Sequence, residues 1–305
     1  MRANIIGAGI AGPMAAITLA SHGCEVHAYD NRAAADLRSD GVLGITHASW
    51  DVLIRYGVQG VVTRQLPNGG DSDYHYIVWT DLHTSLVERA VELGAVFHYG
   101  ETLTDEESDA DVTVRATGVG SARQVSHPRY SGYVIVRGLA YQFSGSAWTS
   151  LRSESEAGPW LFSAGDTRDG SSIEFFVPRK DVTLRTTYSS EPPVEASRLP
   201  LRWKRLVETV PTFQMAPMSD WDVPEYMINP SVQRPLIRIG DANGQLRPQT
   251  SMGANLAILE GSDVDLLVNW SQAAESARLA DRRVQYDAGI KIGIYRNREL
   301  SKVIL

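Results

Sequence analysis

The sequence predicts an α/β fold in which a parallel sheet, built from both ends of the chain, carries an antiparallel β-sheet inserted between them. Three observations predict this fold. Residues 3–30 run as strand, glycine-rich turn, helix and strand, which is the start of a parallel unit. Residues 131–188 lose helical periodicity and show alternating, strand-like segments. Residues 236–284 return to one short strand followed by long helical stretches.

The composition is that of a globular protein and excludes several partners. The chain has 305 residues, 43% of them hydrophobic, which is enough to bury a sizeable core. Its net charge is −7 without a visible cluster of Lys and Arg, so we expect no nucleic-acid partner. The longest apolar stretch, residues 5–20, is broken by three glycines and a proline and is too short for a membrane span. Cys24 is the only cysteine, which excludes an intramolecular disulfide and fits a reducing compartment.

The first strand, residues 3–6, runs directly into a turn with the spacing G-x-G-x-x-G. Gly7 permits the tight turn, Gly9 lets the backbone approach a pyrophosphate, and Gly12 lets the following helix pack closely on the strand. We expect the whole turn to bind the pyrophosphate of a dinucleotide, and it comprises Gly7, Ala8, Gly9, Ile10, Ala11 and Gly12.

The segment after the turn decides between two interpretations of the first thirty residues. A secretory signal peptide explains the apolar run, but it predicts neither a second strand at residues 24–29 nor an acid at its end. A dinucleotide site predicts both, because Asp30 is placed to bond a ribose 2′-hydroxyl. The carboxylate of Asp30 would repel a 2′-phosphate, which favours FAD or NAD over NADP. We therefore expect a mature cytoplasmic protein.

The remaining elements follow from periodicity and breakers. Helices are expected at residues 13–22, 50–56, 81–93 and 201–210 and from residue 256 onward. Strands of the parallel sheet are expected at residues 95–99, 112–116 and 236–239. Strands of the antiparallel sheet are expected at residues 133–136, 139–143, 160–163, 173–177 and 182–188. Residues 63–72 are expected to form a loop, residues 105–111 a turn, and residues 211–230 irregular structure.

These elements predict a discontinuous domain organisation. The dinucleotide-binding domain is expected to comprise residues 1–60, 80–125 and 233–288. The substrate-binding β-sheet domain is expected to comprise residues 61–79 and 126–232, and residues 289–305 are expected to form a C-terminal tail.

Three short blocks resemble those of a known family. They read G-A-G-I-A-G at the first turn, R-A-T-G-V-G-S-A-R at residues 115–123, and G-D-A-N-G-Q-L-R-P-Q-T-S-M-G-A-N at residues 240–255. In this order they resemble the FAD-dependent monooxygenases of the aromatic-hydroxylase fold, which are p-hydroxybenzoate hydroxylase-like. The late block is the most specific of the three and favours FAD over NAD. The resemblance implies a Rossmann-like FAD-binding domain with an inserted antiparallel β-sheet substrate layer.

The resemblance also implies cofactor contacts. Asp30 would hold the adenosine ribose, Asp241 would meet a ribityl hydroxyl or the pyrophosphate, and Pro248 would line the face where oxygen adds. The backbone of Gly253, Ala254 and Asn255 would begin a helix beside the isoalloxazine ring and stabilise charge on the reduced flavin. The other positions that the resemblance assigns to FAD are Asn31, Arg32, Leu43, Ala116, Thr117, Gly118 and Gly240.

The middle block departs from the family pattern, which usually reads A-D-G. Here it reads Ala116-Thr117-Gly118, and this T-G resembles the two-component styrene and indole monooxygenases, which receive reduced FAD from a partner reductase. Trp79 and Thr80 stand where the family often has an Arg that touches the flavin. The expected electron source is therefore NADH or NADPH, acting on this chain or through a separate flavin reductase.

The predicted function is that of an FAD-dependent oxidoreductase, a monooxygenase that inserts one oxygen atom from O₂ into a small apolar or aromatic substrate. In the family this proceeds through a flavin C4a-(hydro)peroxide, so the cofactor carries the chemistry and we assign no catalytic residue. A flavin dehydrogenase or reductase on the same fold, and a non-catalytic flavin-binding protein, stay open as alternatives. The seven histidines show no ligand spacing, so no metal is expected. Some aromatic and Met side chains would line a substrate pocket or serve as ordinary packing, namely Trp203, Met215, Met218, Trp221, Tyr226 and Met227.

Overall fold

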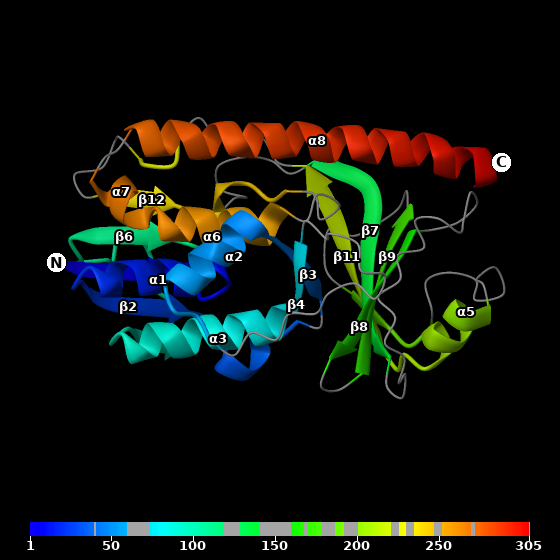
Figure 1. Cartoon of the computed structure of the whole chain (residues 1–305), viewed down its shortest axis with the longest axis horizontal. Coiled ribbons are helices and arrows are strands. Elements are labelled where there is room, and N and C mark those ends of the chain that lie inside the picture. The colour runs from blue at the N-terminus through cyan, green and yellow to red at the C-terminus, as the bar shows by residue number, and fades with distance from the viewer. Residues whose placement is uncertain are drawn as a thin grey trace.

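Two sheets lie end to end, and one long helix runs along both of them (Figure 1). The computed structural model describes residues 1–39, 41–59, 74–118, 129–140, 160–167, 170–178, 187–191, 201–220, 226–229, 235–246, 252–269 and 272–304. The long helix is α8 (Gln272–Ile304), which starts beside the first sheet and ends beside the second.

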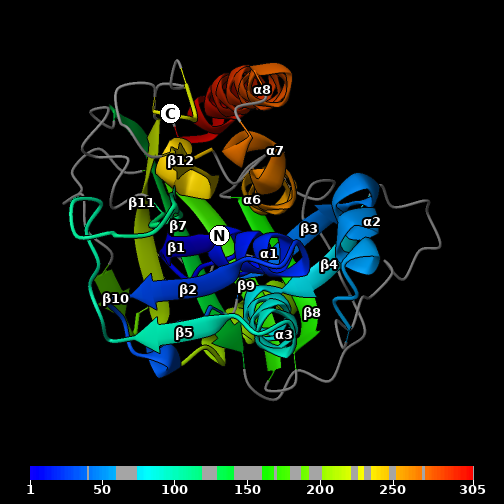
Figure 2. The ribbon, with the colours of Figure 1, turned by 90° about the vertical axis from the view of Figure 1, so that its left-hand side faces the viewer.

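The first sheet is parallel and has the strand order β12-β6-β1-β2-β5. Its strands are β1 (Arg2–Ile6), β2 (Glu25–Asp30), β5 (Val96–Tyr99), β6 (Val112–Arg115) and β12 (Leu236–Arg238). Helices gather on one side of this sheet (Figure 2), namely α1 (Ala11–Ser21), α3 (Trp79–Glu92), α6 (Met252–Ser262) and α7 (Val264–Val268). Alternate strand residues such as Ile5, Val114 and Ile237 are fully buried in the core that these helices cover.

The second sheet is antiparallel and has the order β10-β11-β7-β9-β8. Its strands are β7 (Arg129–Ala140), β8 (Trp160–Thr167), β9 (Gly170–Pro178), β10 (Thr187–Ser189) and β11 (Phe213–Asp220). A two-stranded antiparallel sheet lies between the two larger sheets (Figure 1), formed by β3 (Val42–Thr46) and β4 (Tyr74–Val78). The remaining elements are η1 (Ala34–Asp36), α2 (His47–Arg55), α5 (Leu201–Glu208) and the 3₁₀ turn η4 (Gly240–Asn243).

The predicted α/β class is confirmed: the chain combines a parallel sheet covered by helices with a separate antiparallel sheet. The helices predicted at residues 13–22, 81–93 and 201–210 are present with shifted ends, as are the parallel strands. The predicted turn at residues 105–111 is also present, whereas the predicted loop at residues 63–72 lies outside the described residues.

Several local predictions are wrong for identifiable reasons. The two strands expected on either side of Gly138 are one strand, β7, as far as Ala140, and residues 141–143 lie outside the described residues. Gly138 does not end the strand; Val210 and Phe213 occupy the space where its side chain would lie, so packing requires a glycine there. The expected irregular segment 211–230 contains β11, whose alternation is obscured by a register shift at Pro217. The pairing of β3 with β4 was not predicted. Residues 289–304, expected as a tail, continue α8.

Candidate functional site

Several of the predicted site residues follow the carboxyl ends of the parallel strands. In such sheets, this edge is where ligands bind. The chain runs from β1 into Gly7, from β2 into Asn31, from β6 into Ala116 and from β12 into the turn at Gly240. A Cβ atom at Gly7 would lie 2.4 Å from the carbonyl oxygen of Ala116. The first and middle blocks of the sequence are therefore in direct contact.

The three motif glycines have different surroundings. Gly7 has a φ of +103°, which non-glycine residues rarely adopt. A Cβ atom at Gly12 would lie 2.0 Å from the carbonyl oxygen of Gly7, so the turn closes only with glycine there. A Cβ atom at Gly9 would meet no atom of the described residues within 4 Å. Gly7 and Gly12 therefore serve the fold, whereas Gly9 leaves open space in front of the turn, as close approach of a ligand requires.

Asp30 ends β2 and is already fully hydrogen-bonded by the chain. Its Oδ2 accepts from the Ala8 N–H at 2.9 Å and from Arg32 Nη2 at 2.8 Å. Its Oδ1 accepts from the backbone N–H and the Nε of Arg32 at 3.0 and 2.9 Å. Burial of this 5%-exposed residue acts to raise the pKa of its carboxyl group, but the bonds from Arg32 and Ala8 prevail and hold that pKa below its ordinary value. Asp30 is thus an anion shielded by Arg32.

His83 supports the same turn and was missed by the sequence analysis. Its Nε2–H donates to the carbonyl oxygen of Ala8 at 2.8 Å, and its ring stacks on Trp79 at 4.8 Å between centroids. Burial lowers the pKa of the imidazole, which favours the neutral form. Both backbone polar groups of Ala8 are therefore held, the N–H by Asp30 and the carbonyl oxygen by His83. The sequence did contain a signal for this role, because His83 stands beside Leu82 on the apolar face of α3.

The late turn, η4, carries two polar side chains that suit a ligand. Burial raises the pKa of Asp241 to about 6, with Arg282 lowering it and Glu260 raising it to smaller extents. Asp241 Oδ1 lies 4.0 Å from the Cβ position of Gly253, so the turn and the start of α6 face each other. Asn243 is 2% exposed, and in the described part of the chain neither its Nδ2 nor its Oδ1 has a hydrogen-bond partner. Buried amides are normally bonded, so these atoms fit a polar group supplied by a ligand.

A buried ion pair that the sequence analysis missed holds the late turn. Glu260 on α6 accepts from the Gly240 N–H at 2.7 Å and from Arg282 Nε at 2.5 Å. Arg282 on α8 donates to the carbonyl oxygens of Gly240 and Gly244 at 2.5 and 2.7 Å. The side chains of Glu260 and Arg282 are 0% and 3% exposed. Because one guanidinium bonds both ends of the turn, α8 fixes the backbone around Asp241.

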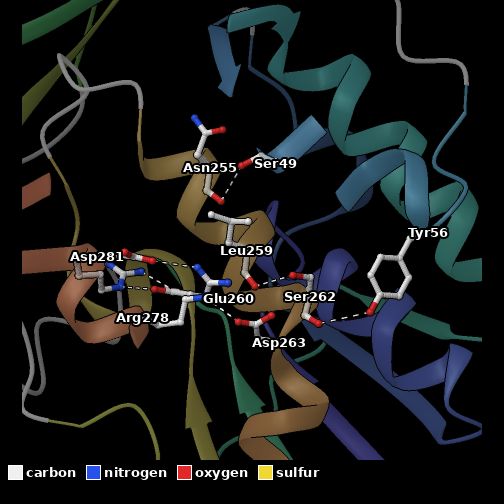
Figure 3. Close-up of polar contacts among 10 residues, drawn as sticks. Ser49, Tyr56, Asn255, Leu259, Glu260, Ser262, Asp263, Arg278 and Asp281 are labelled. Atoms are coloured by element: carbon white, nitrogen blue, oxygen red, sulfur yellow. Dashed lines mark hydrogen bonds and ion pairs between the residues drawn. The ribbon is translucent and has the colours of Figure 1, made fainter. Parts of the chain in front are cut away.

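Asn255 is buried at the start of α6, and its side chain is committed to the chain itself. Its Oδ1 accepts from the Thr46 N–H at 2.8 Å, and its Nδ2 donates to the Gly44 carbonyl at 2.7 Å. Ser49 Oγ donates to its backbone carbonyl at 3.4 Å (Figure 3). These bonds tie the first turn of α6 to the end of β3 and the start of α2. N–H groups in a first helical turn lack partners within the helix and are suited to an anion.

The other predicted site residues have varied positions. Asn31 is exposed at the end of β2, Thr117 and Gly118 are half-buried after β6, and Leu43 packs partly buried against the core. Pro248 lies outside the described residues. Within the described part of the chain, no group of three or more His, Cys, Asp or Glu side chains could hold a metal ion. Among the helices of the described ranges, none has the length and apolar character needed to cross a membrane.

Solved structures share this fold along the whole chain. No protein-family model matches the chain, and no curated protein matches it. PqsL, a probable FAD-dependent monooxygenase from Pseudomonas aeruginosa, matches with a TM-score of 0.74 at 15% identity, over 100% of this chain and 99% of that one. A 2-methyl-3-hydroxypyridine-5-carboxylic acid oxygenase matches with a TM-score of 0.69 at 18% identity, over 99% and 92%. Klebsiella pneumoniae HpxO, crystallised with FAD and uric acid, matches with a TM-score of 0.67 at 15% identity, over 96% and 87%. The chain has the fold of these proteins.

Proposed function

We propose that this chain, which has the fold of FAD-dependent monooxygenases, binds FAD and inserts one oxygen atom from O₂ into a small apolar or aromatic substrate. The observation that carries the proposal is the open space in front of Gly9. At the other two glycines of this turn, backbone atoms of the chain occupy the space where a Cβ would lie. This turn, Asp30, Asp241 and the start of α6 lie along one edge of the parallel sheet. That edge is where an extended dinucleotide crosses such sheets.

The residues present fit an FAD molecule in this site. The backbone between Gly9 and Gly12 and the N-terminus of α1 would face the pyrophosphate. Asp30 would accept a hydrogen bond from a ribose hydroxyl, and Asp241 and the unpartnered Asn243 would meet polar groups of the ribityl chain or the pyrophosphate. The first turn of α6 would face the flavin ring and stabilise negative charge there. Bound FAD supplies the activation of O₂, and the chain supplies binding, orientation and exclusion of water.

The further details are part of the proposal. The electron source is NADH or NADPH, and Thr117 in place of the usual acid favours delivery of reduced FAD by a separate reductase. Residues 1–60, 80–125 and 233–288 form the FAD-binding domain, and residues 61–79 and 126–232 form the substrate domain. The cytoplasmic location stays a prediction from the sequence.

Substitution of Gly9 tests the site. We expect the purified chain to bind FAD, and Gly9→Val to reduce this affinity at least about tenfold, because the added side chain fills the space that the pyrophosphate needs. The melting temperature of the ligand-free variant should match that of the wild-type chain, because a Cβ there meets nothing. A wild-type chain that binds no FAD, or a Gly9→Val chain that binds it as tightly, would contradict the proposal.

A second measurement separates oxygenation from dehydrogenation. We expect the chain, supplied with chemically reduced FAD, O₂ and aromatic test substrates, to yield a product heavier by one oxygen atom that carries label from ¹⁸O₂. Direct bleaching of bound FAD by NADH or NADPH would show that no reductase is needed. A substrate that loses two hydrogens without gaining labelled oxygen would instead support the flavin dehydrogenase.

A further inference from the structure

The Asp30 carboxylate has no hydrogen-bonding capacity left for a ligand. A carboxylate has about four acceptor positions, and this chain fills all of them. The bonds come from the backbone N–H groups of Ala8 and Arg32 and from Nε and Nη2 of Arg32, at 2.8–3.0 Å. A ribose hydroxyl that donates to Asp30 must therefore displace one of these donors.

The donor that can leave is the Arg32 side chain. The Ala8 N–H belongs to a residue whose carbonyl oxygen is also held, by His83, and the Arg32 N–H is fixed by the backbone after β2. The Arg32 side chain is 51% exposed, whereas that of Asp30 is 3% exposed. Exposed Asp36 on η1 also stabilises the Arg32 charge, so a displaced guanidinium has solvent and a second carboxylate beside it.

We propose that the Arg32 side chain competes with the adenosine ribose of FAD for the Asp30 carboxylate. This competition weakens the binding of FAD and speeds its exchange. The inference rests on the proposed function, because it assigns Asp30 to the ribose. Each binding event breaks a bidentate Arg–carboxylate pair, which is the strong geometry for such pairs. Each dissociation event re-forms that pair, so the Arg32 side chain favours release. A chain that receives reduced FAD from outside requires such exchange.

The test measures equilibrium binding of FAD and of ADP to the full chain by titration calorimetry. We expect Arg32→Ala to bind both ligands about two- to tenfold more tightly than the wild-type chain, because the pair is half exposed and of modest strength. Arg32→Gln, which loses the charge but keeps length and one donor group, should shift both affinities in the same direction by less. This second variant keeps the test valid if Arg32→Ala folds poorly.

A matched control is Arg2→Ala. It removes the same charge and a single-bonded, more exposed pair, Arg2–Asp109 at 3.1 Å, at the amino end of β1. This variant should bind FAD and ADP as the wild-type chain does. An equal tightening in Arg2→Ala would mean that net charge, and not the position of Arg32, sets the affinity, which would overturn the inference.

The remaining outcomes are distinguishable. Weaker binding of both ligands by Arg32→Ala would show that Arg32 holds the ligand itself, and unchanged binding would show no competition; both overturn the inference. Tight binding of NADPH that Arg32→Ala abolishes would overturn it as well, since Arg32 would then serve a 2′-phosphate. If ADP binds more tightly to Arg32→Ala while FAD binds to neither chain, the competition at Asp30 stands and the proposed flavin function fails.

Discussion

The two turns of the candidate site are built in opposite ways. The first turn, Gly7–Gly12, is closed by the packing of Gly12 on Gly7 and by hydrogen bonds to the backbone of Ala8, with Asp30 at its N–H and with His83 at its carbonyl oxygen. The late turn, Gly240–Gly244, is closed by Glu260 on α6 and Arg282 on α8. The shape of the first turn is set by steric limits that only glycine meets, and the shape of the late turn depends on a buried ion pair. The comparison teaches that one candidate site can combine a turn closed by steric contact with a turn closed by buried charge.

Removal of the Arg282 charge should have the largest effect. Arg282→Met leaves Glu260 charged and unpaired in the core, which should lower the free energy of unfolding by about 3–5 kcal/mol. Urea denaturation measures this loss. Arg278→Ala is the control on the same helix, because Arg278 bonds Asp263 and Asp281 in a 19%-exposed position (Figure 3) and should cost about 1 kcal/mol or less. Equal costs for the two variants would contradict the assigned dependence of the late turn on Arg282.

The steric closure of the first turn should come next in size. Gly12→Ala places a Cβ 2.0 Å from the Gly7 carbonyl oxygen and should cost about 3 kcal/mol of unfolding free energy, because the turn must open. Gly23→Ala is the control beyond the other end of α1, since Gly23 has open space around it and only a φ of +76° to disfavour the substitution. It should cost about 1 kcal/mol. A Gly12→Ala chain as stable as Gly23→Ala would show that the turn is not closed by this contact.

The bonds of Asn255 should have a smaller effect. Asn255→Ala removes the side-chain bonds to Thr46 and Gly44 and should lower the free energy of unfolding by about 2 kcal/mol. Ser49→Ala removes one long bond of 3.4 Å to the same helix start and should cost less than about 1 kcal/mol. Both are measured by urea denaturation. If Ser49→Ala costs as much as Asn255→Ala, the side chain of Asn255 does not position α6.

The pH dependence from Asp241 should be the smallest effect. Its folded-state pKa of about 6 is above the ordinary value of 3.8, so the folded chain binds this proton more tightly than the unfolded chain. The resulting stability is complete below about pH 4 and is lost as pH rises through 6. Asp241→Asn cannot ionise, so we expect its free energy of unfolding to rise by about 1 kcal/mol relative to that of the wild-type chain between pH 4 and pH 7.5. This gain is smaller than the full pKa shift implies, because the residue is partly exposed. A difference that stays constant with pH would contradict this expectation.

The contrast between the turns also explains what the sequence could predict. The spacing of Gly7, Gly9 and Gly12 is a local pattern that indicates one kind of turn. The turn, the strand before it and the helix after it were therefore predicted with small errors in their bounds. The bonds of Arg282 to Gly240 and Gly244 join segments far apart in the sequence, and no spacing indicates them. One signal was present: Glu260 is the single charged residue in the apolar helix Met252–Ser262, and a buried charge requires a partner. β11 was missed because its polar and apolar residues do not alternate cleanly.

The position of Arg282 has a consequence for how the chain is made. Protein synthesis releases the glycine turn and Asp30 early, and both can fold with the strands and helix beside them. The turn that carries Asp241 gains its closing cation only when α8 has left the ribosome, long after residues 240–244 themselves. During that interval the Glu260 carboxylate lies without its partner in a helix built for the core. The late turn of the nascent chain therefore stays incomplete until α8 docks.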